Sequence, residues 1–219
     1  MDLITVIEYA GIVAFAITGV ITAIEKNLDV FGCIVLGFTT AVGGGILRDI
    51  LLGYLPPAVL RTPDYAIIAI ISSLVTFLIA AIAGKKIKNN FNIYSQIINV
   101  FDSMGLAVFA VAGTQQAHNF GFIENKFLSV FIGLLTCVGG GVLRDIFAGK
   151  IPTILKKRIY ALAALAGAIT FQILTEYSLC KYNLALVLSI AAVLVVRTLA
   201  TIFHWNMPSI KELADDESK

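Results

Sequence analysis

Long uncharged apolar runs recur along the chain, and short polar connections separate them. Most runs approach the roughly 20 residues that an α-helix needs to cross the hydrocarbon core of a bilayer. Strands of a membrane β-barrel would be shorter and would alternate in polarity, which these runs do not. The pattern predicts an all-α polytopic membrane protein with seven transmembrane helices, at Tyr9–Ile24, Val30–Leu47, Tyr65–Gly84, Ser103–Ala117, Phe127–Leu143, Ile159–Thr175 and Leu184–Val196, the last continuing past Arg197 to about Phe203.

The composition supports this prediction. Of the 219 residues, 58% are hydrophobic and only 14% are charged, whereas soluble domains carry about 25% charged residues. The first apolar run has no basic segment before it and continues to full span length, unlike a secretory signal peptide. We therefore expect the first span to remain in the mature protein.

The basic residues predict how the chain is oriented. Because seven spans alternate in direction, the connections fall on two sides, with ten Lys and Arg residues on one side and three on the other. Lys and Arg accumulate in cytoplasmic loops. We therefore predict a multi-pass cell (inner) membrane protein with the N-terminus outside and a cytoplasmic C-terminal tail. The basic side holds Lys26, Lys85, Lys86, Lys88, Lys150, Lys156, Lys157, Arg158, Lys211 and Lys219, and the other side holds Arg61, Lys126 and Lys181.

One half of the chain repeats the other. The segment AVGGGILRDI at 41–50 returns as CVGGGVLRDI at 137–146, and IEYAGIVAFAITG at 7–19 aligns with FDSMGLAVFAVAG at 101–113. Each unit holds three spans, so the second copy must cross the membrane in the opposite sense, as in transporters built from inverted repeats. The predicted organisation is a first repeat at 1–90, an inverted repeat at 95–176, a seventh helix at 183–205 and a cytoplasmic tail at 206–219.

Each repeat interrupts its second span with three glycines. An interior glycine costs a helix about 1 kcal/mol relative to alanine, so we expect the second and fifth helices to kink or partly unwind there. Freed backbone groups are tolerated in a membrane only when they are buried in protein or line a watery cavity. The alternative is that the glycines only allow close helix packing. The residues concerned are Gly43, Gly44, Gly45, Gly139, Gly140 and Gly141.

An Arg-Asp pair follows each glycine triplet, as Arg48–Asp49 and Arg144–Asp145. Charges inside a membrane usually pair or face water. Neighbouring residues on a helix point about 100° apart, so we expect each arginine to find a partner other than the adjacent aspartate. The alternating topology supplies one acidic residue near each arginine. The expected ion pairs are Glu8–Arg48 and Asp102–Arg144.

This pairing leaves Asp49 and Asp145 available to cations, although both could instead cap helix ends. The hydroxyl groups of Thr39, Thr40 and Thr136, just before the glycines, could supply oxygen ligands to a partly dehydrated cation. Threonines also bond to carbonyl groups of their own helix. Both alternatives remain open at this point.

The paired GGGxLRD segments, seven spans and two three-span repeats resemble the prokaryotic branch of the trimeric intracellular cation (TRIC) channel family, which overlaps a bacterial glycine-transporter family. The resemblance covers about residues 1–205. It implies a homotrimer in the lipid bilayer with one pore in each subunit, lined by helices kinked at the glycines. It also implies conduction of a monovalent cation, K⁺ or Na⁺, with no cofactor. The resemblance leaves open whether the protein also binds a lipid.

A carrier for a small amino acid such as glycine is the alternative function, since a carrier needs an anion for the amine and a helix N-terminus for the carboxylate. The GGGILRD segment lacks the GK[ST] ending of a phosphate-binding loop. The sequence shows neither a nucleophile–base constellation nor the cysteine spacing of a metal site. It therefore predicts no enzyme, no metal site and no nucleic-acid partner.

Overall fold

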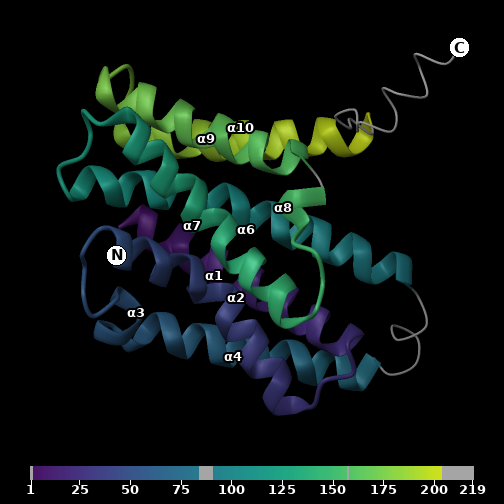
Figure 1. Ribbon diagram of the computed structural model, residues 1–219. Coiled ribbons are helices and arrows are strands. Elements are labelled where there is room, and N and C mark those ends of the chain that lie inside the picture. Colours follow the sequence, from purple (N-terminus) through teal and green to yellow (C-terminus); the bar gives the residue numbers. More distant parts are fainter. Residues whose placement is uncertain (1, 84–90, 157, 204–219) are drawn as a thin grey trace, which may run out of the picture.

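The computed structural model describes residues 2–83, 91–156 and 158–203, and the helices in these ranges run side by side as a bundle (Figure 1). The predicted tail at 206–219 and several of the predicted cytoplasmic lysines, at 85, 86, 88 and 157, lie outside the described residues. The helices are α1 (Leu3–Glu25), α2 (Val30–Leu51), α3 (Ala58–Arg61), α4 (Pro63–Ala83), α6 (Phe91–Asn119), α7 (Lys126–Phe147), α8 (Thr153–Lys156), α9 (Arg158–Glu176) and α10 (Tyr182–Ile202).

Seven of these helices are long and apolar enough to cross a membrane, which confirms the predicted number of spans. The largest difference from the predicted boundaries is at α6, which begins at Phe91 rather than near Ser103. The sequence pattern missed this part because Asn99 and Asp102 interrupt the apolar run. Asp102 is nevertheless almost fully buried, so the helix continues through a polar position that has partners inside the protein.

Helices α1, α2, α6 and α7 form the centre of the bundle, and α2 packs directly against α7. Helix α4 covers one side by packing on α1 and α2, while α9 and α10 pair on the other side (Figure 1). The short helices α3 and α8 lie toward opposite ends of the bundle (Figure 1). Each of them follows the glycine-containing helix of its own half, so the two halves present the same elements at opposite ends.

In each half, the first two long helices contact each other through a pair of glycines. Gly19 of α1 lies against Gly37 of α2, and a Cβ atom added at Gly19 would be 2.6 Å from the Gly37 Cα atom. Gly113 of α6 lies against Gly133 of α7, where the corresponding distance is 2.9 Å. Glycine pairs let helix backbones approach closely. The first two helices of each half thus pack in the same way, and the division into two three-span units stays a prediction.

The contact between the two halves is reciprocal at α1 and α6. Gly105 of α6 packs on the ring of Phe15, and Gly11 of α1 packs on the ring of Phe109. The two rings also contact each other, with centroids 5.3 Å apart. Such exchange of equivalent residues across one contact is what a two-fold axis generates. It is the arrangement expected of inverted repeats.

Candidate functional site

The middle glycine of each triplet holds α2 and α7 together. A Cβ atom at Gly44 would overlap the backbone carbonyl of Thr136, and one at Gly140 would overlap the carbonyl of Thr40. Both helices remain α-helical through all three glycines. The partial unwinding that we expected is therefore not present, and the kink stays a prediction. The contact geometry favours the packing alternative for these two positions.

The other glycines of each triplet have different surroundings. A Cβ atom at Gly43 would lie 2.6 Å from a methyl group of Leu143, so this first position also faces the opposite helix. At the third position the nearest atoms are farther away. Arg48 Nη2 would be 3.8 Å from a Cβ atom at Gly45, and the Tyr160 hydroxyl would be 3.6 Å from one at Gly141. The third glycine of each triplet thus opens space beside charged and polar groups.

The threonines next to the glycines turn toward their own helices. Thr40 donates its hydroxyl proton to the Leu36 carbonyl at 2.6 Å, and Thr136 donates to the Ile132 carbonyl at 2.6 Å. Both are fully buried in helix contacts, whereas Thr39 is half-buried. Own-helix bonding is the ordinary role of membrane threonines. The geometry therefore favours that role over cation ligation at Thr40 and Thr136.

The predicted ion pair between Asp102 and Arg144 is present, and it is the centre of a closed network. We call this network the inner cluster, after the side of the membrane on which the predicted orientation places it. Arg144 Nη1 donates to Asp102 Oδ1 at 2.9 Å and to the Thr18 hydroxyl at 3.1 Å, while its Nε donates to Asp145 Oδ1 at 2.9 Å. Asp145 Oδ2 accepts the backbone N–H and the hydroxyl of Thr153, at 2.7 and 2.9 Å. Arg144 is only 2% exposed. Its charge is balanced entirely by protein groups.

The expectation that adjacent Arg and Asp residues would not pair is wrong in both halves. Arg48 Nε lies 2.8 Å from Asp49 Oδ1, which matches the Arg144–Asp145 pair. The 100° angle between neighbouring Cα–Cβ directions does not exclude this contact, because an arginine can bend back and use Nε instead of its terminal nitrogens. That geometry leaves the terminal nitrogens free to reach a second partner.

Neither aspartate is left free for cations in this arrangement. Asp49 Oδ2 accepts the N–H of Ala58, the first residue of α3, at 2.8 Å. Asp145 binds the N–H of Thr153, the first residue of α8. A carboxylate on the first N–H groups of a helix satisfies donors that have no partner within the helix. The capping alternative thus describes both residues, although each caps a helix in the following connection rather than its own.

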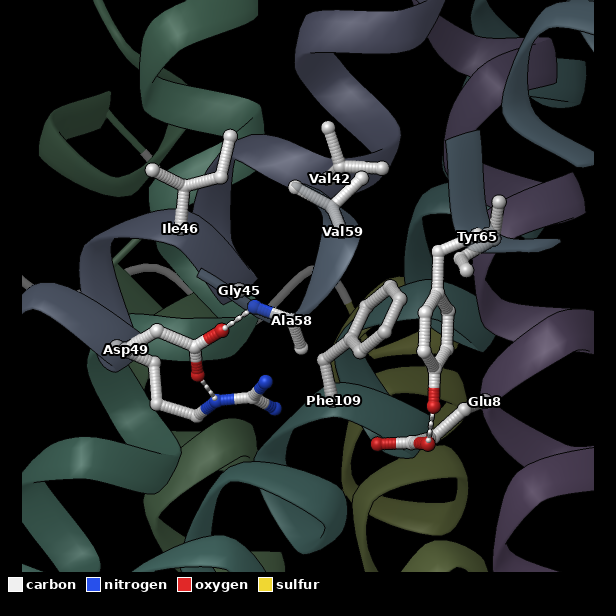
Figure 2. Close-up of a pocket in the computed structure, with 11 residues that line it drawn as sticks. Glu8, Val42, Gly45, Ile46, Asp49, Ala58, Val59, Tyr65 and Phe109 are labelled. Carbon is white, nitrogen blue, oxygen red and sulfur yellow. Dashed lines mark hydrogen bonds and ion pairs between the residues drawn. The ribbon is translucent and has the colours of Figure 1, made fainter. Parts of the chain in front are cut away.

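The predicted pair between Glu8 and Arg48 is not formed directly. The Tyr65 hydroxyl, from α4, donates to Glu8 Oε2 at 2.9 Å, and Arg48 instead binds Asp49. Figure 2 shows Asp49 and Glu8 on different sides of a pocket, with Phe109 between them in this view. We call the group formed by Glu8, Tyr65, Arg48 and Asp49 the outer cluster. The Tyr65 hydroxyl therefore binds the carboxylate that the predicted topology paired with Arg48.

A small cavity occupies the space between Glu8 and Arg48. Its volume is about 40 Å³, and Gly45 lines it together with both charged residues. A water molecule needs about 10–15 Å³ measured in this way, together with polar partners. The cavity therefore has room for water between the two charges. Its remaining walls are largely apolar, at Ile12, Val42, Ile46, Val59 and Phe109.

A larger open cavity, which we call the vestibule, lies next to the outer cluster. It has a volume of about 670 Å³ and is lined by the start of α1, the end of α6 and the start of α10. Glu8 and Tyr65 line both the vestibule and the small cavity. Apart from Glu8, the vestibule residues are absent from the sequence-based site, although polar residues at span ends could have indicated them. Its polar lining is Asp2, Thr5, Glu8, Tyr65, Gln115, Gln116, Asn119, Tyr182 and Asn183.

Sequence reasoning also missed Arg197, a residue of the seventh long helix, α10. Its Nε donates to the Ser103 hydroxyl at 3.0 Å, and its guanidinium carbon lies 5.0 Å from the centroid of the Tyr160 ring. Arg197 is 6% exposed, so this charge is buried beside the inner cluster. The signal in the sequence was a single arginine inside the last apolar run. Such intramembrane charges usually mark functional positions.

Comparison with known proteins identifies relatives along almost the whole chain. The family model described as Glycine transporter matches residues 5–81 and 99–176, which correspond to the two predicted repeats. The UPF0126 inner membrane protein YadS of Escherichia coli K12 is 31% identical over 93% of this chain and 94% of its own length. The UPF0126 membrane protein YvgT of Bacillus subtilis is 35% identical, with 91% and 92% covered.

Solved structures with the same fold are TRIC channels. A TRIC cation channel whose structure addresses conductance has a TM-score of 0.81 at 37% identity, covering 95% of this chain and 97% of that one. The TRIC orthologue from Rhodobacter sphaeroides has a TM-score of 0.83 at 30% identity, with 94% and 100% covered. These relatives are channels rather than enzymes. The chain therefore belongs to the Glycine transporter (UPF0126) family of membrane proteins and shares the fold of the prokaryotic TRIC channels.

Proposed function

We propose that this protein is a monovalent cation channel with one conduction pathway in each chain. The observation that carries this proposal is the match, over 95% of the chain at 37% identity, to a protein described as a TRIC cation channel. Another matching structure is a prokaryotic TRIC channel in 0.5 M KCl, with a TM-score of 0.82. K⁺ is accordingly the ion that we propose to be conducted, with Na⁺ as the alternative.

The proposed pathway runs along the contact between α2 and α7. It begins in the vestibule, passes the small cavity beside Gly45, and continues past the helix contact toward Gly141 and the inner cluster. Carboxylate, amide and hydroxyl oxygens line the vestibule, and oxygen ligands can replace the hydration shell of a cation. The proposed site residues are Glu8, Thr39, Thr40, Gly43, Gly44, Gly45, Arg48, Asp49, Asp102, Thr136, Gly139, Gly140, Gly141, Arg144 and Asp145.

The assembly that we propose is a homotrimer in the lipid bilayer, as in the trimeric relative from Rhodobacter sphaeroides. Several large apolar side chains are exposed on the single chain, among them Ile82 and Phe127. Exposed apolar surface of this kind is suited to lipid or to another subunit. A bound lipid at such a surface belongs to the same proposal.

The decisive experiment is a planar-bilayer recording of the purified protein. We expect unitary current steps, because a channel passes ions far faster than a carrier turns over. In a KCl gradient the reversal potential should shift toward the K⁺ equilibrium potential. Protein-free bilayers from the same lipid and detergent are the control. A reversal potential near that of Cl⁻ would contradict cation conduction.

A carrier for a small amino acid is a second candidate, because Glu8 and Arg48 line the same cavity with opposite charges. A zwitterion could place its ammonium group on Glu8 and its carboxylate on Arg48. Labelled glycine should then enter proteoliposomes and exchange with unlabelled glycine inside, without unitary current steps. That outcome would replace the channel proposal with the carrier.

The proposed orientation places the start of α1 outside and the connections that hold Lys26 and Lys150 in the cytoplasm. Leu60 and Leu155 provide a matched pair of probes, because they occupy equivalent positions in α3 and α8 and are 71% and 70% exposed. In a chain with its three native cysteines replaced, a membrane-impermeant maleimide should label Leu60→Cys in intact cells. Leu155→Cys should react only after lysis. The reverse labelling would invert the proposed orientation.

A further inference from the structure

The two charge clusters differ in net charge, although they are built from equivalent residues. The inner cluster together with the adjacent Arg197 carries two buried carboxylates and two guanidinium groups, whereas the outer cluster carries two carboxylates and one guanidinium group. The neighbouring Lys150–Glu25 ion pair adds no net charge at the inner end, and Asp2 adds a further negative charge to the vestibule. The inner groups are Asp102, Asp145, Arg144 and Arg197, and the outer groups are Glu8, Asp49 and Arg48.

The extra guanidinium comes from the one long helix that lies outside the two repeats. Arg197 of α10 bonds to Ser103, the residue that follows Asp102, and it lies over the ring of Tyr160. Tyr65 is the equivalent of Tyr160 in the first repeat, and there the hydroxyl binds Glu8. The duplication alone would make the two clusters electrically equivalent. The added seventh helix removes this equivalence.

Water has different access to the two clusters. Arg144 is enclosed by protein partners, with two aspartates and the Thr18 hydroxyl around it. Glu8 lines both the small cavity and the open vestibule. Its carboxylate can therefore act on ions that enter from the vestibule. Low-dielectric walls focus the field of such a charge and raise the local concentration of ions of opposite sign.

We propose that Arg197 makes the pathway rectify, so that cations pass more readily from the vestibule end than from the inner end. The proposal deepens the channel function and rests on it. Cations concentrate at the mouth that carries an excess negative charge, and flux from that mouth rises accordingly. The inner mouth lacks this excess because Arg197 neutralises it. Arg197 is thus a positioning residue: its charge changes the electric field along the pathway, and it does not contact the ion.

Current–voltage curves from excised spheroplast patches in symmetrical KCl test this proposal, because all channels in such a patch share one orientation. The ratio of currents at equal positive and negative voltages measures rectification. For the wild-type chain we expect a ratio of about 2–5 in favour of entry from the vestibule at low ionic strength. The ratio should fall as salt rises, because salt screens the fixed charge.

Four variant chains have three different expected ratios. With Asp2 counted, the vestibule end carries two excess negative charges and the inner end carries none. Arg197→Gln and Glu8→Gln each reduce this difference to one charge, so both ratios should fall. The double variant leaves one excess negative charge at each end, and its ratio should approach one. Arg197→Lys keeps the charge and should keep the wild-type ratio. A purely structural role for Arg197 would not make the change in ratio add to that of Glu8→Gln in the double variant.

Each failure of this experiment has a separate meaning. If the wild-type chain conducts with a linear current–voltage curve, the proposed asymmetry is wrong while the channel function stands. If no current is seen at all, the channel function itself fails. Should Arg197→Gln not assemble, Glu8→Gln still decides, because an unchanged ratio in that variant would show that Glu8 supplies no excess charge and would overturn the proposal.

Discussion

Arg144→Gln is expected to lower the free energy of unfolding by about 3–5 kcal/mol, since it removes a cation that contacts two buried carboxylates. Asp102 and Asp145 are 3% and 4% exposed, so neither can recover its hydration by a small movement. The loss should appear as a lower denaturation midpoint of the purified protein in mixed detergent micelles.

Arg48→Gln is the matched control in the other repeat. Arg48 makes one ion pair, with Asp49, and it borders a cavity that has room for water. Water can therefore solvate part of the charge that is left behind, and we expect a smaller loss of about 1–3 kcal/mol. Equal losses for the two variants would contradict the distinction between a closed inner cluster and a hydrated outer cluster.

Gly44→Ala and Gly140→Ala are expected to disrupt the packing of α2 on α7. At both positions the new methyl group would overlap a backbone carbonyl of the opposite helix, and a backbone cannot move aside as a flexible side chain can. Overpacking costs typically 1–3 kcal/mol, and we expect each variant to lie at or above the upper end of this range. The backbone contact, rather than a kink at the glycines, is the reason for this expected loss.

Gly45→Ala and Gly141→Ala provide controls within the same triplets. Their Cβ atoms would meet no atom closer than 3.8 and 3.6 Å, and alanine should favour the helix by about 1 kcal/mol. Thermal unfolding in detergent, followed by size-exclusion chromatography, should show normal folding for these two variants and a loss for the other two. If all four variants unfold alike, the middle glycines do not have the packing role that we assign to them.

The location of the spans and the existence of the repeat could be predicted from the sequence because both depend on local patterns. A helix that crosses a bilayer must satisfy its backbone internally and expose apolar side chains over its length, and such runs are visible without any knowledge of packing. The duplicated GGGxLRD segments then indicated which residues occupy equivalent positions. The inner pair Asp102–Arg144 followed from that equivalence together with the alternating topology.

The same reasoning failed at the outer pair, because partner choice depends on which other helices are nearby. Tyr65 belongs to α4 and takes Glu8, and nothing in the spacing along the chain indicates that its hydroxyl reaches this carboxylate. The connections after α2 and α7 fold back so that α3 and α8 present their first N–H groups to Asp49 and Asp145. A carboxylate has several lone pairs to satisfy, and its surroundings in space decide which donors supply them.

The sequence by itself therefore determined that this is a seven-helix membrane protein made from a duplicated, charge-bearing unit, since hydrophobic length and repeated motifs are properties of the chain. Only the tertiary structure decided how the two units differ. It brought Arg197 of α10 to the inner cluster and left a cavity between Glu8 and Arg48 in the outer cluster. The physical reason is that electrostatic balance is set by distances between residues far apart in the chain, which only the packing of all the helices determines.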